Sequence, residues 1–214
     1  MSLDKSISIW ANSLVGFNPR LDALVTQASE SVLLASLVVG CISIGWANKP
    51  HRPRIAAMIA GGLVSVALCR VLQNIIARPR PCLSLPLHLV GSSAWAAHWG
   101  SYPSDTLCVL GALAATAWWL SPRLGFPAVL AATVVAFARL ALGFHFASDL
   151  LAGFALGATG AYAGGRLLTG AMSRVDWTHP LAVVLTAATA VQCATFLSGV
   201  QLGLKLLWGG ITPN

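Results

Sequence analysis

Long apolar segments, separated by short polar or proline-containing connections, constrain the fold of this chain more than any other feature. These segments cover residues 31–47, 55–76, 106–120, 126–142, 149–167 and 181–207. Roughly 20 apolar residues make one helical span of a bilayer, so the chain holds about six spans and no large second domain. We therefore predict an all-α fold, a polytopic membrane bundle of about six transmembrane helices. It forms one domain over residues 1–214, with the helical core at 28–208.

Composition excludes the ordinary soluble classes of protein. Hydrophobic residues make up 57% of the chain and charged residues 9%, whereas roughly a quarter of a soluble domain is charged. The net charge of +7 would suggest nucleic acid as the partner of a soluble protein. Here the basic residues lie mostly in short loops, where they face lipid headgroups, so we predict no nucleic-acid partner. The five cysteines form no C-x-x-C pair, and we expect no disulfide framework, metal or other cofactor.

The N-terminal segment, residues 1–27, differs from the spans. Its apolar run at 7–17 is too short to cross a bilayer. It also lacks the basic start and the small-residue cleavage site of a secretory signal. We predict an interfacial or re-entrant helix with Trp10 at the membrane surface.

Two patterns organise the predicted bundle. Glycines in the fifth span form two G-x-x-x-G steps between Gly153 and Gly164, which predicts close helix packing. Six basic residues share the connections on one side, which the positive-inside rule makes cytoplasmic. They are Lys49, Arg52, Arg54, Arg123, Arg166 and Arg174. The outer side then holds the 77–104 loop and the turn between the fourth and fifth spans.

Polar residues in or beside the spans fall into three clusters. Their members are Arg70, Gln73, Asn74, Arg78 and Arg80; Tyr102, Pro103, Ser104, Asp105 and Thr106; and Arg139, His145 and Asp149. Ionisable groups within a membrane are costly and usually mark function. The spans place all three clusters at helix ends on the outer side, so we predict that they converge in one interfacial site.

Each cluster has a structural interpretation beside the functional one. Arg78 and Arg80 are placed to snorkel to lipid headgroups, and Ser104 is placed to cap the third span. His145 by itself fits a buried, hydrogen-bonded histidine. Asp149, four residues later, shares a helix face with it, and a carboxylate behind an imidazole fixes its tautomer and raises its nucleophilicity. Arginines, a helix N-terminus and such a histidine together suit a phosphoryl group.

In this order, the residues resemble the type 2 phosphatidic acid phosphatase superfamily, whose integral-membrane members are lipid phosphatases. Its three sequence blocks are K-x-x-x-x-x-x-R-P, P-S-G-H and S-R-x-x-x-x-x-H-x-x-x-D. The matching positions are Arg80 and Pro81, then Pro103 and Ser104, then Arg139, His145 and Asp149. Ala138 replaces the serine of the third block. The stretch G-F-H-F-A-S-D-L-L-A-G looks most like the branch of undecaprenyl diphosphate phosphatases.

The resemblance implies a metal-independent lipid phosphatase in a bacterial inner membrane, with its site facing the periplasm or the outside. His145 would attack phosphorus to form a phosphohistidine, Asp149 would orient the imidazole, and Arg139 would complete the catalytic set. The phosphate-binding candidates are Arg80, Ser104, Arg139, Arg78, Arg70, Gln73, Asp105 and Thr106. The partner would be a membrane lipid phosphate or diphosphate.

Two positions depart from the family pattern. Gln73 stands where the family has lysine, and Arg70, one turn earlier on the same helix face, is placed to supply the cation. Thr106 stands where the family has a general-acid histidine, and His98 in the same loop is a candidate replacement. A phosphomonoester expels an alkoxide, whose conjugate acid is about as weak an acid as water, so its departure needs a proton. A diphosphate expels a phosphate with a second pKa of about 6, so the missing acid favours a polyprenyl diphosphate.

Three alternatives stay open. The same fold could pass the phosphoryl group to a lipid or sugar hydroxyl, as a phosphotransferase does. The chain could also be a catalytically weak relative that binds a phospholipid, although the presence of both His145 and Asp149 argues against this. A transporter is disfavoured because the chain shows no internal repeat.

Overall fold

The computed structural model describes residues 2–30, 40, 42–43, 46–90 and 100–175 of the chain. Every regular element in these ranges is helical, which confirms the predicted all-α class. The predicted sixth span, 181–207, lies outside the described residues, and the first, 31–47, lies largely outside them.

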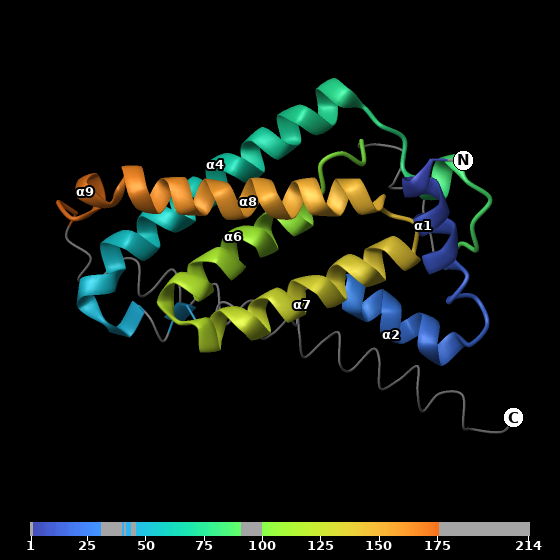
Figure 1. Ribbon diagram of the computed structural model, residues 1–214, viewed down its shortest axis with the longest axis horizontal. Coiled ribbons are helices and arrows are strands. Elements are labelled where there is room, and N and C mark those ends of the chain that lie inside the picture. The colour runs from blue at the N-terminus through green and yellow to red at the C-terminus, as the bar shows by residue number, and fades with distance from the viewer. Residues whose placement is uncertain (1, 31–39, 41, 44–45, 91–99, 176–214) are drawn as a thin grey trace, which may run out of the picture.

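Four long helices form the bundle (Figure 1): α4 (Arg52–Ile76), α6 (Asp105–Leu120), α7 (Pro122–Ala141) and α8 (Ala147–Leu167). α8 packs against both α4 and α6, and α6 also packs against α7. Within the described residues, the stretches Lys49–Ser84 and Pro122–Ala141 are long and apolar enough to cross a membrane, whereas Asp105–Leu120 is apolar but shorter. α4 and α7 begin earlier than predicted, because each has a proline in its first turn, where the fixed φ of proline suits a helix start.

The glycines of α8 let its neighbours approach closely, as the G-x-x-x-G steps predict. A methyl group at Gly153 would overlap the backbone oxygen of Ser104 at the start of α6. One at Gly164 would overlap the backbone oxygen of Ala57 in α4. The glycine stripe therefore fixes α6 and α4 against α8, and at Gly153 it does so directly beside the polar clusters.

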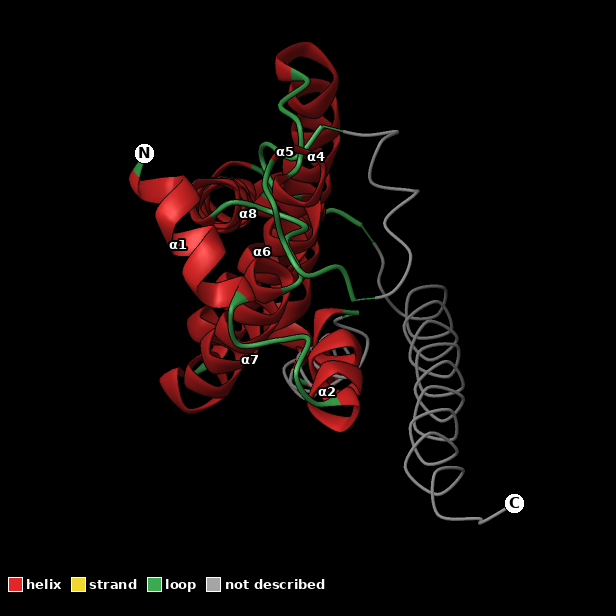
Figure 2. Cartoon of the chain, turned by 90° about the vertical axis from the view of Figure 1, so that its right-hand side faces the viewer, coloured by secondary structure: helices red, strands yellow, loops and turns green. Residues whose placement is uncertain are grey.

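The N-terminal segment forms two short helices, α1 (Leu3–Asn12) and α2 (Pro19–Ser29), where the sequence predicts one. The chain turns between them at Gly16, whose φ of 91° suits glycine, and Asn18 caps α2 by accepting the Arg20 amide. α1 packs on α7 and α8, and α2 packs on α7 (Figure 2). Trp10 is 60% exposed, and its location at a membrane surface stays a prediction.

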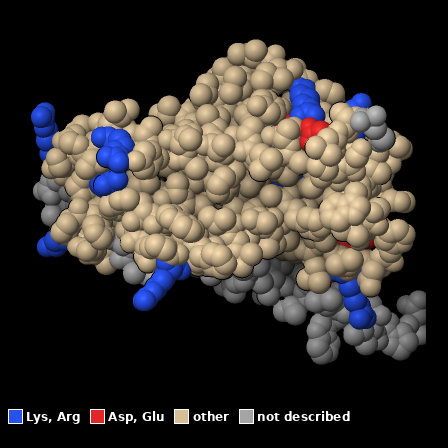
Figure 3. Space-filling view, in the orientation of Figure 1, with Lys and Arg blue, Asp and Glu red and all other residues tan. Residues whose placement is uncertain are grey.

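The helix ends sort the charged residues of the protein into two groups. The C-terminal ends of α4 and α7 and the N-terminal ends of α6 and α8 meet at one end of the bundle, with α1 beside them (Figure 1). The six basic residues predicted on one side lie at the opposite ends of these helices: in the 3-10 helix η1 (Lys49–His51), at the starts of α4 and α7, at the end of α8 and just after α9 (Thr169–Met172). Figure 3 shows Lys and Arg side chains on the surface at that end of the bundle and at the site end. The predicted convergence of the three polar clusters at one end of the bundle is thus confirmed.

Candidate active site

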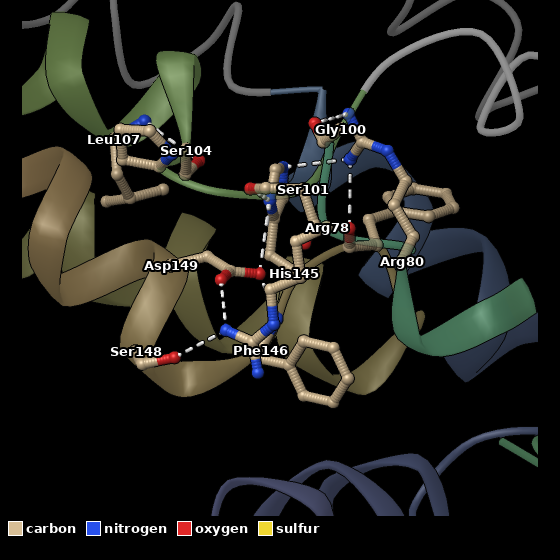
Figure 4. A network of polar contacts seen from close by, with 12 residues as sticks. Arg78, Arg80, Gly100, Ser101, Ser104, Leu107, His145, Phe146, Ser148 and Asp149 are labelled. Carbon is tan, nitrogen blue, oxygen red and sulfur yellow. Dashed lines mark hydrogen bonds and ion pairs between the residues drawn. The ribbon is translucent and has the colours of Figure 1, made fainter. Parts of the chain in front are cut away.

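His145 lies in the turn between α7 and α8 and is fully buried. Gly143, with φ 71°, makes this turn, and its backbone oxygen accepts a hydrogen bond from the Cys82 amide at 2.9 Å. The Nδ1 atom of His145 lies 2.9 Å from the backbone oxygen of Ser101, and its Nε2 atom lies 3.1 Å from Nη1 of Arg80 (Figure 4). A carbonyl only accepts and a guanidinium only donates, so Nδ1 carries the hydrogen and Nε2 presents its lone pair.

The surroundings of His145 keep its imidazole neutral. Burial lowers the pKa of His145 well below its usual range, and the positive charges of Arg80 and Arg139 lower it further. The hydrogen bond to the Ser101 carbonyl opposes this shift. A neutral imidazole with a bare Nε2 is the form that can act as a nucleophile.

Arg80 is held over the imidazole by the loop that carries it. Its side chain is 4% exposed, and Nη1 also donates to the backbone oxygen of Phe144 at 2.9 Å. Nη2 lies 3.5 Å from the backbone oxygen of Gly100. Pro81 follows directly and starts the short helix α5 (Pro81–Ser84), so the backbone beside Arg80 is restricted. The sequence-predicted phosphate ligand Arg80 therefore contacts the predicted nucleophile.

Asp149 joins the turn to α8 and meets a second arginine. Its Oδ2 accepts the Phe146 amide at 2.8 Å, and its Oδ1 accepts Arg78 Nη1 at 2.6 Å. Oδ2 lies 4.0 Å from Nδ1 of His145, beyond hydrogen-bond range. This differs from the prediction that Asp149 fixes the tautomer, because the Ser101 carbonyl occupies that position.

Arg78 is bound by acceptors within the protein. Nη1 also donates to the Ser148 hydroxyl at 2.8 Å, and Nη2 donates to Oδ2 of Asp4 at 2.8 Å. The guanidinium lies 3.9 Å from the centre of the Phe146 ring. The sequence predicts a phosphate or headgroup ligand at Arg78, whereas the structure places the charge between two carboxylates. Sequence reasoning missed Asp4 and Ser148, because contacts across 74 and 144 residues leave no local signal.

Ser104 caps α6, as its structural interpretation predicts. Its hydroxyl accepts the Leu107 amide at 3.4 Å, and its own amide donates to the backbone oxygen of Asp149 at 2.9 Å. Ser104 is fully buried. The backbone amide of Ser104 thus ties the start of α6 to the start of α8.

Gln73, at the position of the family's lysine, and Arg70, the candidate replacement cation, have different surroundings. Gln73 is buried and its amide donates to the backbone oxygen of Pro103 at 2.8 Å, so it anchors the loop before α6. Nη2 of Arg70 lies 2.6 Å from Oδ2 of Asp105, and its Nη1 lies 3.4 Å from Oε1 of Gln73. The cation at Arg70 is therefore neutralised by Asp105 at the rim of the site, and Gln73 acts on the loop.

Thr106 and Arg139 complete the sequence-predicted set. The Thr106 amide donates to the side chain of Asp105 within the first turn of α6. Nε of Arg139 donates to the backbone oxygen of Ser29 at 3.1 Å, which ties the end of α7 to the end of α2. The charge of Arg139 also acts on His145. His98 lies outside the described residues.

Two further features surround the site. Among residues 2–30, 46–90 and 100–175, no group of three or more His, Cys, Asp or Glu side chains is placed to hold a metal ion. An apolar groove of about 290 Å³ runs between α6, α7 and α8, with Leu107, Ala136 and Leu150 in its lining. Leu107 lies one turn beyond Ser104, and Leu150 directly follows Asp149, so the groove begins beside the polar site.

Comparison with known proteins identifies the same region of the chain. The sequence model of the PAP2 superfamily matches residues 53–172. A similar solved structure is that of "the first transmembrane PAP2 type phosphatidylglycerolphosphate phosphatase from Bacillus subtilis", with 22% sequence identity and a TM-score of 0.53. The likeness covers 82% of this chain and 87% of that chain. No protein of curated function matches this sequence.

Proposed function

This chain belongs to the PAP2 superfamily, and from that premise we propose that it is an integral-membrane lipid phosphatase with His145 as its nucleophile. The observation that carries the proposal is the setting of the imidazole. Nδ1 donates to the Ser101 carbonyl, and Nε2 presents a lone pair toward Arg80. All three family blocks contribute residues to this one end of the bundle.

The first step of the proposed reaction transfers the terminal phosphoryl group to His145. The lone pair on Nε2 forms a bond to phosphorus, while the bridging P–O bond breaks and the leaving group takes its electron pair. The phosphorylated imidazole becomes positively charged, and its Nδ1–H stays bonded to the Ser101 carbonyl. The carboxylate of Asp149, 4.0 Å from Nδ1, stabilises that charge.

The second step hydrolyses the phosphohistidine. A water oxygen bonds to phosphorus and the N–P electron pair returns to Nε2. One proton of the water stays on the attacking oxygen, and the other passes to a phosphoryl oxygen. Histidine is then restored in its starting tautomer. Each step develops charge on the phosphoryl oxygens, and arginines aimed at such charge are a major source of rate enhancement.

Substrate binding requires Arg80 to change partners. Its Nη1 lies against Nε2 of His145, in the space that phosphorus must enter. Phosphoryl oxygens would replace Nε2 and the Phe144 carbonyl as acceptors for this guanidinium. A charged acceptor forms a hydrogen bond roughly twice as strong as a neutral one, so a phosphate favours the exchange.

The leaving group of the proposed substrate follows from Thr106. Threonine cannot donate a proton near neutral pH, and general acid catalysis is typically worth about 10²–10⁴-fold. A lipid monophosphate expelled from a diphosphate departs without protonation, since its second pKa is about 6. We therefore assign a polyprenyl diphosphate as the substrate, with its tail in the membrane and the site on the outer face of a bacterial inner membrane.

The test is phosphate release by the purified protein in detergent, with a chelator present and no added metal. A polyprenyl diphosphate, a polyprenyl monophosphate and phosphatidate are compared in wild type and His145→Ala. His51→Ala is the matched control, because His51 contacts Trp119 at the far end of the bundle. Release from the diphosphate, lost only in His145→Ala, supports the proposal.

Other outcomes contradict parts of it. Equal phosphate release from phosphatidate would contradict the leaving-group argument, but the proposal that the protein is a phosphatase would still stand. Release that survives in His145→Ala would exclude His145 as nucleophile. If no lipid releases phosphate but the phosphoryl group is transferred to an added lipid or sugar hydroxyl, the protein is a phosphotransferase and not a phosphatase.

A further inference from the structure

The N-terminal helix α1 is fixed at both of its ends across the site end of the bundle (Figure 1). At its C-terminal end, the buried side chain of Asn12 donates to the backbone oxygens of Ala141 and His88 at 2.8 and 3.1 Å. It also accepts the His88 amide at 2.7 Å. At the other end, Asp4 binds Ser148 and Arg78. Such specific polar contacts at both ends exceed what a helix resting on a membrane surface requires.

We propose that Asp4 is a positioning residue of the active site, which holds Arg78 against Asp149 and so makes α1 part of the catalytic unit. This inference rests on the proposed function. Asp4 lies outside residues 53–172, the segment matched by the family model, so the family pattern does not include it.

The first step of the argument is the geometry around Arg78. Its two terminal nitrogens point to different carboxylates, Nη1 to Asp149 at 2.6 Å and Nη2 to Asp4 at 2.8 Å. Its flat face lies on the Phe146 ring. Without Asp4 the guanidinium would be bound through Nη1 alone, by Asp149 and the Ser148 hydroxyl, whereas a partner on Nη2 as well fixes its plane on the Phe146 ring.

The second step is that the buried carboxylate of Asp149 depends on the positive charge of Arg78. Asp149 is fully buried, and a buried carboxylate that loses its cation is strongly destabilised. The same carboxylate accepts the amide of Phe146, the residue that follows His145. Movement of Arg78 is therefore transmitted through Asp149 to the turn that carries the nucleophile.

The third step concerns the start of α8. Free amide groups at a helix N-terminus attract anions. Here Oδ1 of Asp4 accepts the Ser148 amide at 3.1 Å and its Oδ2 accepts the Ser148 hydroxyl at 2.5 Å, while Asp149 accepts the Phe146 amide. These carboxylates occupy the end of α8, so a phosphate is directed to the Arg80 side of the imidazole.

The charge state of Asp4 agrees with this assignment. Burial acts to raise the pKa of Asp4, but hydrogen bonds from Ser148 and Arg78 outweigh it, and the pKa lies below its usual value. Asp4 is therefore ionised at neutral pH and can hold Arg78.

The test compares Asp4→Asn with Asp22→Asn. Asp22 is the matched control because its carboxylate accepts the Gly16 amide at 2.9 Å in the same N-terminal segment, away from Arg78. We expect Asp4→Asn to lower kcat for polyprenyl diphosphate hydrolysis about tenfold, the effect of losing one charge-assisted hydrogen bond, with KM nearly unchanged. Asp4→Glu restores the charge and part of kcat. Asp22→Asn keeps the wild-type kcat.

Coupling to Arg78 separates positioning from a general loss of structure. If Asp4 acts through Arg78, Asp4→Asn lowers kcat much less in an Arg78→Ala background than in wild type. Equal effects in both backgrounds, or a kcat for Asp4→Asn equal to that of Asp22→Asn, would overturn the inference. Size-exclusion chromatography in detergent verifies that each variant is folded. If Asp4→Asn does not fold, the partial kcat expected of Asp4→Glu is the measurement that tests the inference.

Hydrogen exchange provides a readout that does not depend on substrate. We expect faster exchange of the amides over residues 146–148 in Asp4→Asn than in Asp22→Asn, because two of them are held by this network. Unchanged exchange would overturn the inference. Wild-type protein that releases no phosphate but shows this difference would contradict the proposed function alone.

Discussion

Arg78 and Arg80 are two residues apart in the sequence, yet they have different partners and different roles. We call the surroundings of each arginine its side of the site. Arg78 lies between two carboxylates, so its charge is balanced within the protein. Nη1 of Arg80 contacts Nε2 of His145 and the backbone oxygen of Phe144, and neither of these two acceptors carries a full negative charge. A phosphate gains more from the second arginine than from the first. The carboxylates that balance the charge of Arg78 give it a structural role, whereas Arg80 can bind the substrate. The A-R-P-R-P sequence does not reveal this difference.

The largest expected effect is on the Arg80 side. Arg80→Ala should lower phosphate release from the diphosphate by about 10²–10³-fold, the loss typical of one donor to a transition-state oxyanion. Its Tm should change little compared with that of Arg78→Ala, since it is the Arg78 guanidinium that pairs with the buried carboxylate of Asp149, at 2.6 Å. Steady-state rates and thermal unfolding in detergent check both values. A large fall in the Tm of Arg80→Ala with near-normal activity would mean that Arg80 stabilises the fold and does not bind the substrate.

The Arg78 side should respond mainly in stability. Arg78→Ala leaves the buried carboxylate of Asp149 without its cation, and we expect a loss of about 2 kcal/mol in the free energy of unfolding, because Arg78 itself is partly exposed. Activity should fall about tenfold, as the turn at His145 loses its support. Arg78→Lys keeps the charge but not the two-sided geometry, so its stability should lie between those of wild type and Arg78→Ala.

The pH dependence tests the neutral imidazole. The pKa of His145 is lowered by burial and by the charges of Arg80 and Arg139. The unfolded chain therefore takes up a proton at His145 before the folded protein does. The contribution of His145 to stability is fully present above about pH 6.5, the ordinary value for histidine, and is lost as the pH falls toward the folded pKa.

Activity should follow the same group. We expect the acid limb of kcat/KM to lie below pH 6.5 by a clear margin, and to move to higher pH in Arg80→Gln, which removes one of the charges that lower this pKa. A pH–rate profile with the polyprenyl diphosphate measures the acid limb in wild type and in Arg80→Gln. An acid limb at or above pH 6.5 in wild type would contradict a buried neutral nucleophile.

The smallest effect is expected at Thr106, in the first turn of α6. Thr106→His restores a general acid, and we expect phosphatidate hydrolysis to rise by about tenfold, below the full range for general acid catalysis because the surroundings are not adapted to it. Diphosphate hydrolysis should change less. Thr106→Asn, which is polar but cannot donate a catalytic proton, is the control. Equal gains on both substrates would contradict the leaving-group argument.

Much of the architecture was predictable because its signals are local. Hydropathy located α4, α6, α7 and α8 to within a few residues, and the prolines explain the earlier starts of α4 and α7. The glycine steps predicted close packing of α8. Antiparallel spans alone require that helix ends at 76, 105, 141 and 147 share one side, so the convergence of the three clusters was predictable too.

The pairing of side chains within that end was not predictable. Nothing local links Asp4 to Arg78 or His145 to Ser101, whose contacts cross 74 and 44 residues. Gln73 was expected at the phosphate but holds the Pro103 carbonyl. The sequence alone determined which residues reach the site, because span length and polarity act along one helix at a time. Only the tertiary structure decided which charge meets which, because that depends on distances of a few ångströms between separate elements.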